Sequence, residues 1–143
     1  MSDSQIFIDT NVVVYAHDVT AGEKRTRAKG IMTELWETDE GCLSVQVLQE
    51  TFVTLTTKVP RPLDVDAATG VIADLGRWTV HSPDPEDVLG AIEIQQRNHL
   101  SFWDSMIVRS AGRLGCHVLY SEDLNPGRYA GVTVHNPFVE IKM

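Results

Sequence analysis

Four carboxylates in this chain occupy positions from which acidic side chains could act together. Asp9 ends the apolar run "IFI" near the start of the chain, and Asp123 follows the apolar run "HVLY" near its end. Asp104 stands in "SFWDSMIV", and Glu50 stands in "SVQVLQETF". Two carboxylates about 4 Å apart repel each other by about 4 kcal/mol at an effective dielectric constant of about 20. A site built from all four acids therefore needs a cation to neutralise them.

The ligand types narrow the choice of cation and of chemistry. No Cys/His set accompanies the acids, and ligand sets made only of oxygen suit Mg²⁺ or Mn²⁺. Such an ion lowers the pKa of a bound water, orients it for in-line attack and offsets charge on a phosphate. The acids therefore predict phosphodiester hydrolysis in which the protein supplies no nucleophile. The histidines are scattered without pattern, which disfavours a metal-free ribonuclease that uses histidine as acid and base.

Each acid also has a plainer structural interpretation. Asp9 could cap a helix, and Asp104 could be an acid that stabilises the first turn of a helix. Glu50 could be an ordinary surface glutamate. The functional interpretation depends on elements that bring the acids to one place.

Strands and helices alternate along the chain. We expect strands at about 6–8, 41–45, 78–82, 116–121 and 131–138, and helices from Thr10 or Asn11, at about 22–37, 44–58, after Asp64, at 82–98 and at 102–114. This alternation predicts one α/β domain over residues 1–143, with a mainly parallel sheet of about five strands and helices on both faces. Ligands bind beyond the carboxyl ends of such strands. Asp9 and Asp123 would stand at that edge if their strands are neighbours.

Helical periodicity places the other two acids less firmly. The helix at 44–58 is expected to bury Val45, Leu48, Phe52 and Leu55. Glu50 then falls on the opposite side of that helix. The helix at 102–114 is expected to bury Trp103, Ile107, Ala111 and Leu114. Asp104 then falls on the border of the buried stripe, where a carboxylate needs a partner.

The charge balance bears on possible partners. The chain has 143 residues and a net charge of −8, which opposes nonspecific attraction to nucleic acid. Its one basic cluster, a candidate RNA-binding patch or a solvated helix face, is Lys24, Arg25, Arg27 and Lys29. Cys42 and Cys116 form no zinc motif or disulfide framework, and neither a signal peptide nor a membrane span is indicated. These features predict a protein of the reducing cytoplasm.

Taken together, the motifs resemble the PIN-domain nucleases, and within them the VapC-type toxins of bacterial toxin–antitoxin pairs. The resemblance covers essentially the whole chain. It rests on the stretches "FIDTNVVVYA", "LSVQVLQETFVTLTTK", "SFWDSMIVRSAGRLGC" and "LYSEDLNPGRYAGVTVHNPF". Each stretch is a weak motif alone, but their order and spacing make a strong signal. The fold that the resemblance implies is a three-layer sandwich formed by a single PIN domain.

The resemblance also implies the roles of individual residues. Catalysis and metal binding would belong to Asp9, Glu50, Asp104 and Asp123, with Mg²⁺ or Mn²⁺ as cofactor. Small polar residues beside the first and last acids, Asn11 and Ser121, would support them. Glu122 would be either an additional outer acid or a side chain that points away while Asp123 does the work.

The resemblance implies partners as well. The expected activity is that of an endoribonuclease toxin acting on RNA, commonly a homodimer, and inhibited by a cognate antitoxin whose tail occupies the active-site groove. Further candidates for phosphate or antitoxin contacts are Arg61, Arg97, Arg109 and Arg113. The alternative is a non-catalytic PIN-like module that binds RNA or a protein.

Overall fold

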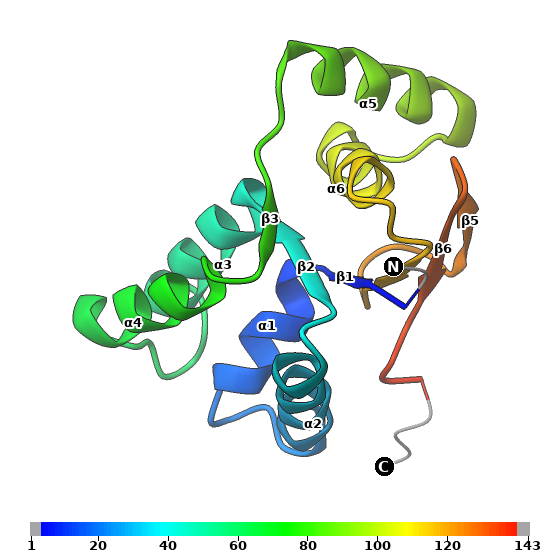
Figure 1. Cartoon of the computed structure of the whole chain (residues 1–143). Helices are drawn as coiled ribbons and strands as arrows, with labels where there is room; N and C mark the ends of the chain where they lie inside the picture. The colour runs from blue at the N-terminus through cyan, green and yellow to red at the C-terminus, as the bar shows by residue number, and fades with distance from the viewer. Residues whose placement is uncertain (1–3, 140–143) are drawn as a thin grey trace.

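The computed structural model describes residues 4–139, so residues 1–3 and 140–143 of the expected domain lie outside it (Figure 1). In chain order the elements are β1 (Ile6–Ile8), α1 (Thr10–His17), α2 (Glu23–Thr38), β2 (Gly41–Ser44), α3 (Val45–Thr57), α4 (Val65–Leu75), β3 (Thr79–His81), α5 (Pro85–Asn98), α6 (Phe102–Arg113), β4 (Val118–Tyr120), β5 (Gly127–Tyr129) and β6 (Val132–His135). The predicted alternation of strands and helices is confirmed. None of the described helices is long and apolar enough to cross a membrane.

Local sequence explains where several helices begin. Each of these helices starts after a side chain whose oxygen accepts a hydrogen bond from a backbone N–H of the first turn. These caps are Ser44 for α3, Asp64 for α4, Asp84 for α5 and Ser101 for α6. At α5 the cap is reciprocal, because the carboxylate of Asp87 also accepts from the N–H of Asp84.

The strands form one sheet in the order β3-β2-β1-β4-β6-β5. All neighbouring pairs are parallel except β5 with β6. The sheet thus has six strands rather than the expected five or so, because the segment after the "NPG" turn forms β5. Ala130 and Gly131 join β5 to β6, and both have positive φ angles, 51° and 85°. Two-residue turns of this kind match the twist of a hairpin, which explains the additional strand.

The centre of the sheet decides which distant residues meet. β1 lies between β2 and β4, with Ile8 opposite Tyr120, and the N–H of Asp9 donates to the carbonyl of Tyr120 at 3.0 Å. The expected adjacency of the first strand and the "HVLY" strand is therefore confirmed. Phe7 and Ile8 are fully buried, so the strand that ends at Asp9 is anchored in the core.

Helices cover both faces of the sheet. The pair α5 and α6 packs together on one side of β1, while α1 and α2 pack together on the other side (Figure 1). Helix α3 contacts α1 and β2, and α4 packs against α3. This is the expected α/β sandwich.

Two predicted helix faces are wrong in detail. On α3 only Leu55 of the expected stripe is buried, whereas Gln46, Val47 and Thr51 are buried instead. Val45, Leu48 and Phe52 are half-buried, and Leu48 and Phe52 line a cavity together with Thr69, Ile72 and Ala73 of α4. On α6 the expected core residue Trp103 is 62% exposed. Trp103 lies in the first turn of α6. Periodicity predicts which way a side chain points, but it does not predict whether another element covers that turn.

Candidate functional site

The four acids predicted from the sequence line a single cavity of about 560 Å³. Asp9 follows β1, Glu50 lies on α3, Asp104 lies in the first turn of α6, and Asp123 follows β4. The sheet order brings the ends of β1 and β4 together, and α3 and α6 bring the other two acids to the same edge. The structure thus places these residues together as expected, while their chemical roles stay predictions.

Asp9 is the most enclosed of the four acids, with 5% of its surface exposed. It caps α1, as its structural interpretation proposed, because its Oδ1 accepts the N–H of Thr10 at 2.8 Å. Its Oδ2 accepts the hydroxyl of Ser121 at 2.7 Å and the amide of Asn11 at 3.4 Å. The Ser121 hydroxyl in turn accepts the N–H of Asp123 at 3.1 Å. The two predicted supporting residues therefore both contact Asp9, and one of them also fixes the backbone at Asp123.

Glu50 is held at both of its oxygens. The Thr10 hydroxyl donates to Oε1 at 2.6 Å, and the side-chain amide of Gln46 donates to Oε2 at 3.1 Å. Gln46 also donates to the backbone carbonyl of Trp103 at 3.2 Å, which links α3 to the first turn of α6 beside Asp104. Thr10 contacts Asp9 through its N–H and Glu50 through its hydroxyl, so one residue orients two acids from different elements.

The acids act on one another electrostatically. Burial raises the pKa of Asp9 to about 6; hydrogen bonds from Ser121 and Thr10 oppose this rise, and the negative charges of Glu50 and Asp123 add to it. Burial also raises the pKa of Asp104, with smaller contributions from the charges of Asp123 and Glu50. Carboxylates whose pKa values are raised by burial and by like charges are typical of functional sites.

Glu122 is not among the residues that line the cavity. Its Oε1 accepts the hydroxyl of Tyr15 at 2.5 Å, and its Oε2 forms an ion pair with the ammonium of Lys24 at 2.5 Å. The Lys24 ammonium also lies 5.1 Å from the centroid of the Tyr15 ring. Glu122 therefore ties the loop after β4 to α1 and α2, and it does not join the acid cluster.

The predicted basic cluster does not line the acid cavity. Lys24 is paired with Glu122, and Arg27 donates from its Nε to the carbonyl of Pro137 at 3.1 Å. Arg25 and Lys29 line a separate cavity of about 380 Å³ between α2 and α4. The cluster is continuous in sequence, but the helix directs its members to different surroundings.

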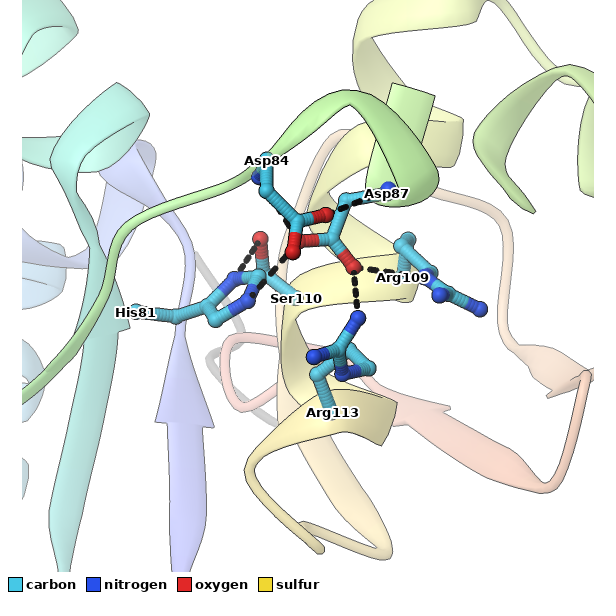
Figure 2. Close-up of polar contacts among 6 residues, drawn as sticks. All are labelled: His81, Asp84, Asp87, Arg109, Ser110 and Arg113. Carbon is cyan, nitrogen blue, oxygen red and sulfur yellow. Dashed lines mark hydrogen bonds and ion pairs between the residues drawn. The ribbon is translucent and has the colours of Figure 1, made fainter. Parts of the chain in front are cut away.

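Two of the other candidate arginines are engaged inside the protein (Figure 2). The buried carboxylate of Asp87 accepts the Nε of Arg109 at 2.8 Å and a guanidinium nitrogen of Arg113 at 2.6 Å, both at Oδ1. Its Oδ2 accepts the N–H of Asp84 at 2.9 Å and lies 3.2 Å from the Nε2 of His81. These contacts tie α5 to α6 and β3, so Arg109 and Arg113 already neutralise a carboxylate of the chain itself.

A further contact in this cluster has the residue types of a hydrolase triad. The Nδ1 of His81 lies 2.8 Å from the hydroxyl of Ser110, and its Nε2 faces Asp87. Ser110 is fully buried, so no substrate can reach its hydroxyl. The cluster is structural.

The other two candidate arginines, Arg61 and Arg97, are exposed, and the guanidinium of Arg97 lies 3.9 Å from the carboxylate of Glu93.

The acids of the cavity can be compared with the ligands that a metal ion requires. Within residues 4–139, no three His, Cys, Asp or Glu side chains lie close enough together to ligate one ion. The chemistry of the donors nevertheless fits a hard cation, because the acids supply only oxygen, and the charges of Glu50 and Asp123 contribute to the raised pKa of Asp9 and of Asp104. Mg²⁺ usually keeps several waters and binds one or two carboxylates directly. The site suits that kind of binding rather than a closed protein cage.

The sequence interpretation missed one charged residue of the cavity. Lys58 caps the end of α3 and is the one cation among the described residues that line the acid cavity. Its spacing could have revealed it, since Glu50, Thr54 and Lys58 follow one another at four-residue intervals along α3 and all line the cavity.

Comparison with known proteins gives a family match and several structural likenesses. The family model described as "PIN domain" matches residues 6–132. Comparison with curated proteins finds no match to this chain. Among solved structures, VapC20 from Mycobacterium tuberculosis, described as a toxin that cleaves the sarcin–ricin loop, is 18% identical with a TM-score of 0.66, and the alignment covers 90% of this chain and 99% of that one.

Two complexes resemble the chain to a similar extent. A toxin–antitoxin complex from Klebsiella pneumoniae is 19% identical with a TM-score of 0.67, covering 94% of this chain and 98% of that chain. DNA-bound VapBC from Salmonella typhimurium is 19% identical with a TM-score of 0.65, covering 96% and 99%. At such identities these likenesses concern the fold.

Proposed function

Because this chain belongs to the PIN domain family, we propose that its acid cavity hydrolyses RNA phosphodiester bonds with the help of Mg²⁺ or Mn²⁺. One observation carries the proposal. Asp9, Glu50, Asp104 and Asp123 come from four separate parts of the chain and line one cavity, and no described side chain neutralises them there. Asp9 is the buried member of this set, and a buried acid left without a positive partner costs stability, which is expected where the charge serves a ligand.

The side chains around the acids prepare them for a cation. Thr10, Ser121 and Gln46 fix the carboxylate orientations of Asp9 and Glu50 by hydrogen bonds, as supporting residues do around metal ligands. Asp9 and the other three acids would hold the ion, partly through its waters. When bound, the ion supplies a water of lowered pKa and offsets charge on the phosphate.

The raised pKa of Asp9 makes cation binding depend on pH. Since the pKa of Asp9 is about 6 without a metal ion, a cation must displace a proton from this carboxyl group at lower pH. Cation affinity and hydrolysis should therefore both weaken as the pH falls below about 6.

The toxin role, the partners and the compartment are part of the same proposal. A toxin that cleaves an RNA loop and two toxin–antitoxin assemblies share this fold, which supports an endoribonuclease of VapC type with an antitoxin partner. We also propose a homodimer acting in the reducing cytoplasm, where the free thiols of Cys42 and Cys116 would persist.

The second candidate is a PIN-like module that binds RNA or a protein without cleaving it. It is favoured by the spacing of the acids, which lets no three of them ligate one ion in the described residues. The raised pKa values of Asp9 and Asp104 favour catalysis instead, because a module without a cation gains nothing from such carboxylates.

A nuclease assay separates the two candidates. The purified full chain is incubated with end-labelled single-stranded and stem–loop RNA in Mg²⁺, Mn²⁺ or chelator, beside Asp9→Asn and Asp104→Asn. We expect hydrolysis only with a divalent ion and a loss of more than about 100-fold in both variants, above the cost of losing a supporting residue.

Glu122→Gln is the matched control, because it removes a carboxylate from the same loop but outside the cavity. It should keep most of the activity. Hydrolysis that persists in chelator, or in both aspartate variants, would overturn the metal site. Binding of RNA with no hydrolysis under any condition would favour the non-catalytic module.

A further inference from the structure

The acid cavity carries one positive charge. Lys58 is the one cation that lines it among the residues described, and its side chain is exposed at the end of α3. Within residues 4–139 its ammonium makes no hydrogen bond or ion pair. Lys24 and Arg109, by contrast, are each paired with a carboxylate. Lys58 therefore faces the cavity with its charge uncommitted.

The position of Lys58 relative to the acids suggests what it binds. Glu50 and Lys58 lie on the same helix, and eight residues span about 12 Å along a helix axis. No ion pair joins the two side chains in the described residues, so Lys58 is not the partner of Glu50. Thr54 and the half-exposed Val53 line the cavity between them.

The negative charge of this cavity repels an RNA strand, and a bound cation offsets that repulsion only close to the acids. The chain carries a net charge of −8, and four carboxylates line the cavity. A divalent ion would offset part of the negative charge of the acids and of the phosphate being cleaved. Neighbouring phosphates of the same strand still need a positive group, because binding of nucleic acid depends on Lys and Arg replacing its counterions.

We propose that Lys58 binds a phosphate of the RNA strand adjacent to the one being cleaved, and so fixes the path along which the strand crosses the cavity. This inference rests on the proposed function and names the residue that orients its substrate. The flexible stem of a lysine suits a phosphate whose exact position varies with the sequence of the RNA. Lys58 is a positioning residue and takes no part in the chemical step.

The salt dependence of RNA binding tests this assignment. Binding of a fluorescent single-stranded RNA is measured by anisotropy at several KCl concentrations and constant Mg²⁺, in the Asp9→Asn background to prevent cleavage. Each phosphate contact contributes about 0.7 to the slope of log affinity against log salt for a single strand. We expect Lys58→Ala to reduce this slope by about that amount and Lys58→Arg to restore it.

Arg77→Ala provides the matched control, because Arg77 is an exposed cation just after α4 that does not line the cavity. It removes the same unit of charge and should leave the slope unchanged. In the active chain Lys58→Ala should raise KM and leave kcat nearly the same, whereas a folding defect would lower the active fraction and the melting temperature. Circular dichroism checks the fold of each variant.

The outcomes separate failure of this inference from failure of the proposed function. Metal-dependent hydrolysis with an unchanged salt slope and KM in Lys58→Ala would overturn the role of Lys58 and leave the function intact. Loss of antitoxin binding in Lys58→Ala, with RNA binding unchanged, would assign the residue to the protein partner and also overturn it. A wild-type chain that neither binds nor cleaves RNA would overturn both.

Discussion

Two buried aspartates in this protein have opposite electrostatic surroundings, which shift their pKa values in opposite directions. Asp9 caps α1 and Asp87 lies in the first turn of α5, and both are almost inaccessible to water. Burial raises the pKa of both, but for Asp87 the hydrogen bonds from the backbone N–H of Asp84 and from Arg109, together with the charges of His81 and Arg113, bring it down to about 2. Asp9 has only neutral donors and acidic neighbours, and its pKa is about 6.

The difference identifies which acid is structural and which awaits a ligand. The chain itself supplies the positive charge for Asp87, as Figure 2 shows. It supplies none for Asp9, although Ser121 and Thr10 hold the carboxylate in place. A buried charge that the protein orients without neutralising is a candidate for binding a cation from solution.

The largest expected contrast is in stability after removing each charge. Asp87→Asn should lower the free energy of unfolding by about 3 kcal/mol, because it weakens the charged hydrogen bonds from Arg109 and Arg113, whose side chains are partly exposed to water. Asp9→Asn in the metal-free protein should change it little or increase it, since the variant removes repulsion from Glu50 and Asp123. Urea denaturation in chelator measures both values. Equal destabilisation of the two variants would contradict the comparison.

The pH dependence of stability should differ in sign for the two acids. The pKa of Asp9 is about 6 in the folded state and near its ordinary value of 3.8 in the unfolded state, so without metal its contribution to stability is lost as pH rises from about 4 to 6. That loss is at most about 3 kcal/mol. The contribution of Asp87 is lost instead as pH falls from about 4 to 2, because its folded pKa is about 2.

Urea midpoints between pH 2 and 7 separate these windows, with each aspartate variant as the control for its own acid. Asp9→Asn should flatten the dependence above pH 4, and Asp87→Asn should flatten it below pH 4. Saturating Mg²⁺ should remove the loss above pH 4 in the wild type alone. A wild-type curve unchanged by Asp9→Asn would show that this carboxyl titrates normally.

The smallest effect concerns how tightly the Asp87 cluster is packed. A methyl group at Gly90 would lie 2.6 Å from a guanidinium nitrogen of Arg109, which Asp87 holds in place. Gly90→Ala should therefore destabilise the chain by about 1 kcal/mol despite the better helix propensity of alanine. In an Arg109→Ala background the same change should stabilise by up to about 1 kcal/mol. Thermal denaturation of the four proteins measures this coupling, and additive effects would argue against close packing.

Much of the fold and part of the site could be predicted because their signals are local. Caps such as Ser44 and Asp64 and the apolar periodicity mark helices within a few residues, and the confirmed element order follows from them. Asp9 and Asp123 could be placed at the edge of the sheet because they directly follow strands. Asp87 could be recognised as an acid near a helix start, but its partners on α6 could not be foreseen.

The sequence alone determined the helices and most strands, since hydrogen-bonding caps and side-chain periodicity act between neighbours in the chain. The set of four acids was predicted from the resemblance of their motifs to those of the PIN-domain nucleases. Only the tertiary structure decided that β4 pairs with β1, that Glu122 turns to Lys24, that Arg109 and Arg113 serve Asp87, and that Lys58 shares the cavity with the acids. These outcomes depend on contacts between residues distant in sequence. Such contacts are fixed by how whole elements pack, and no local pattern encodes them.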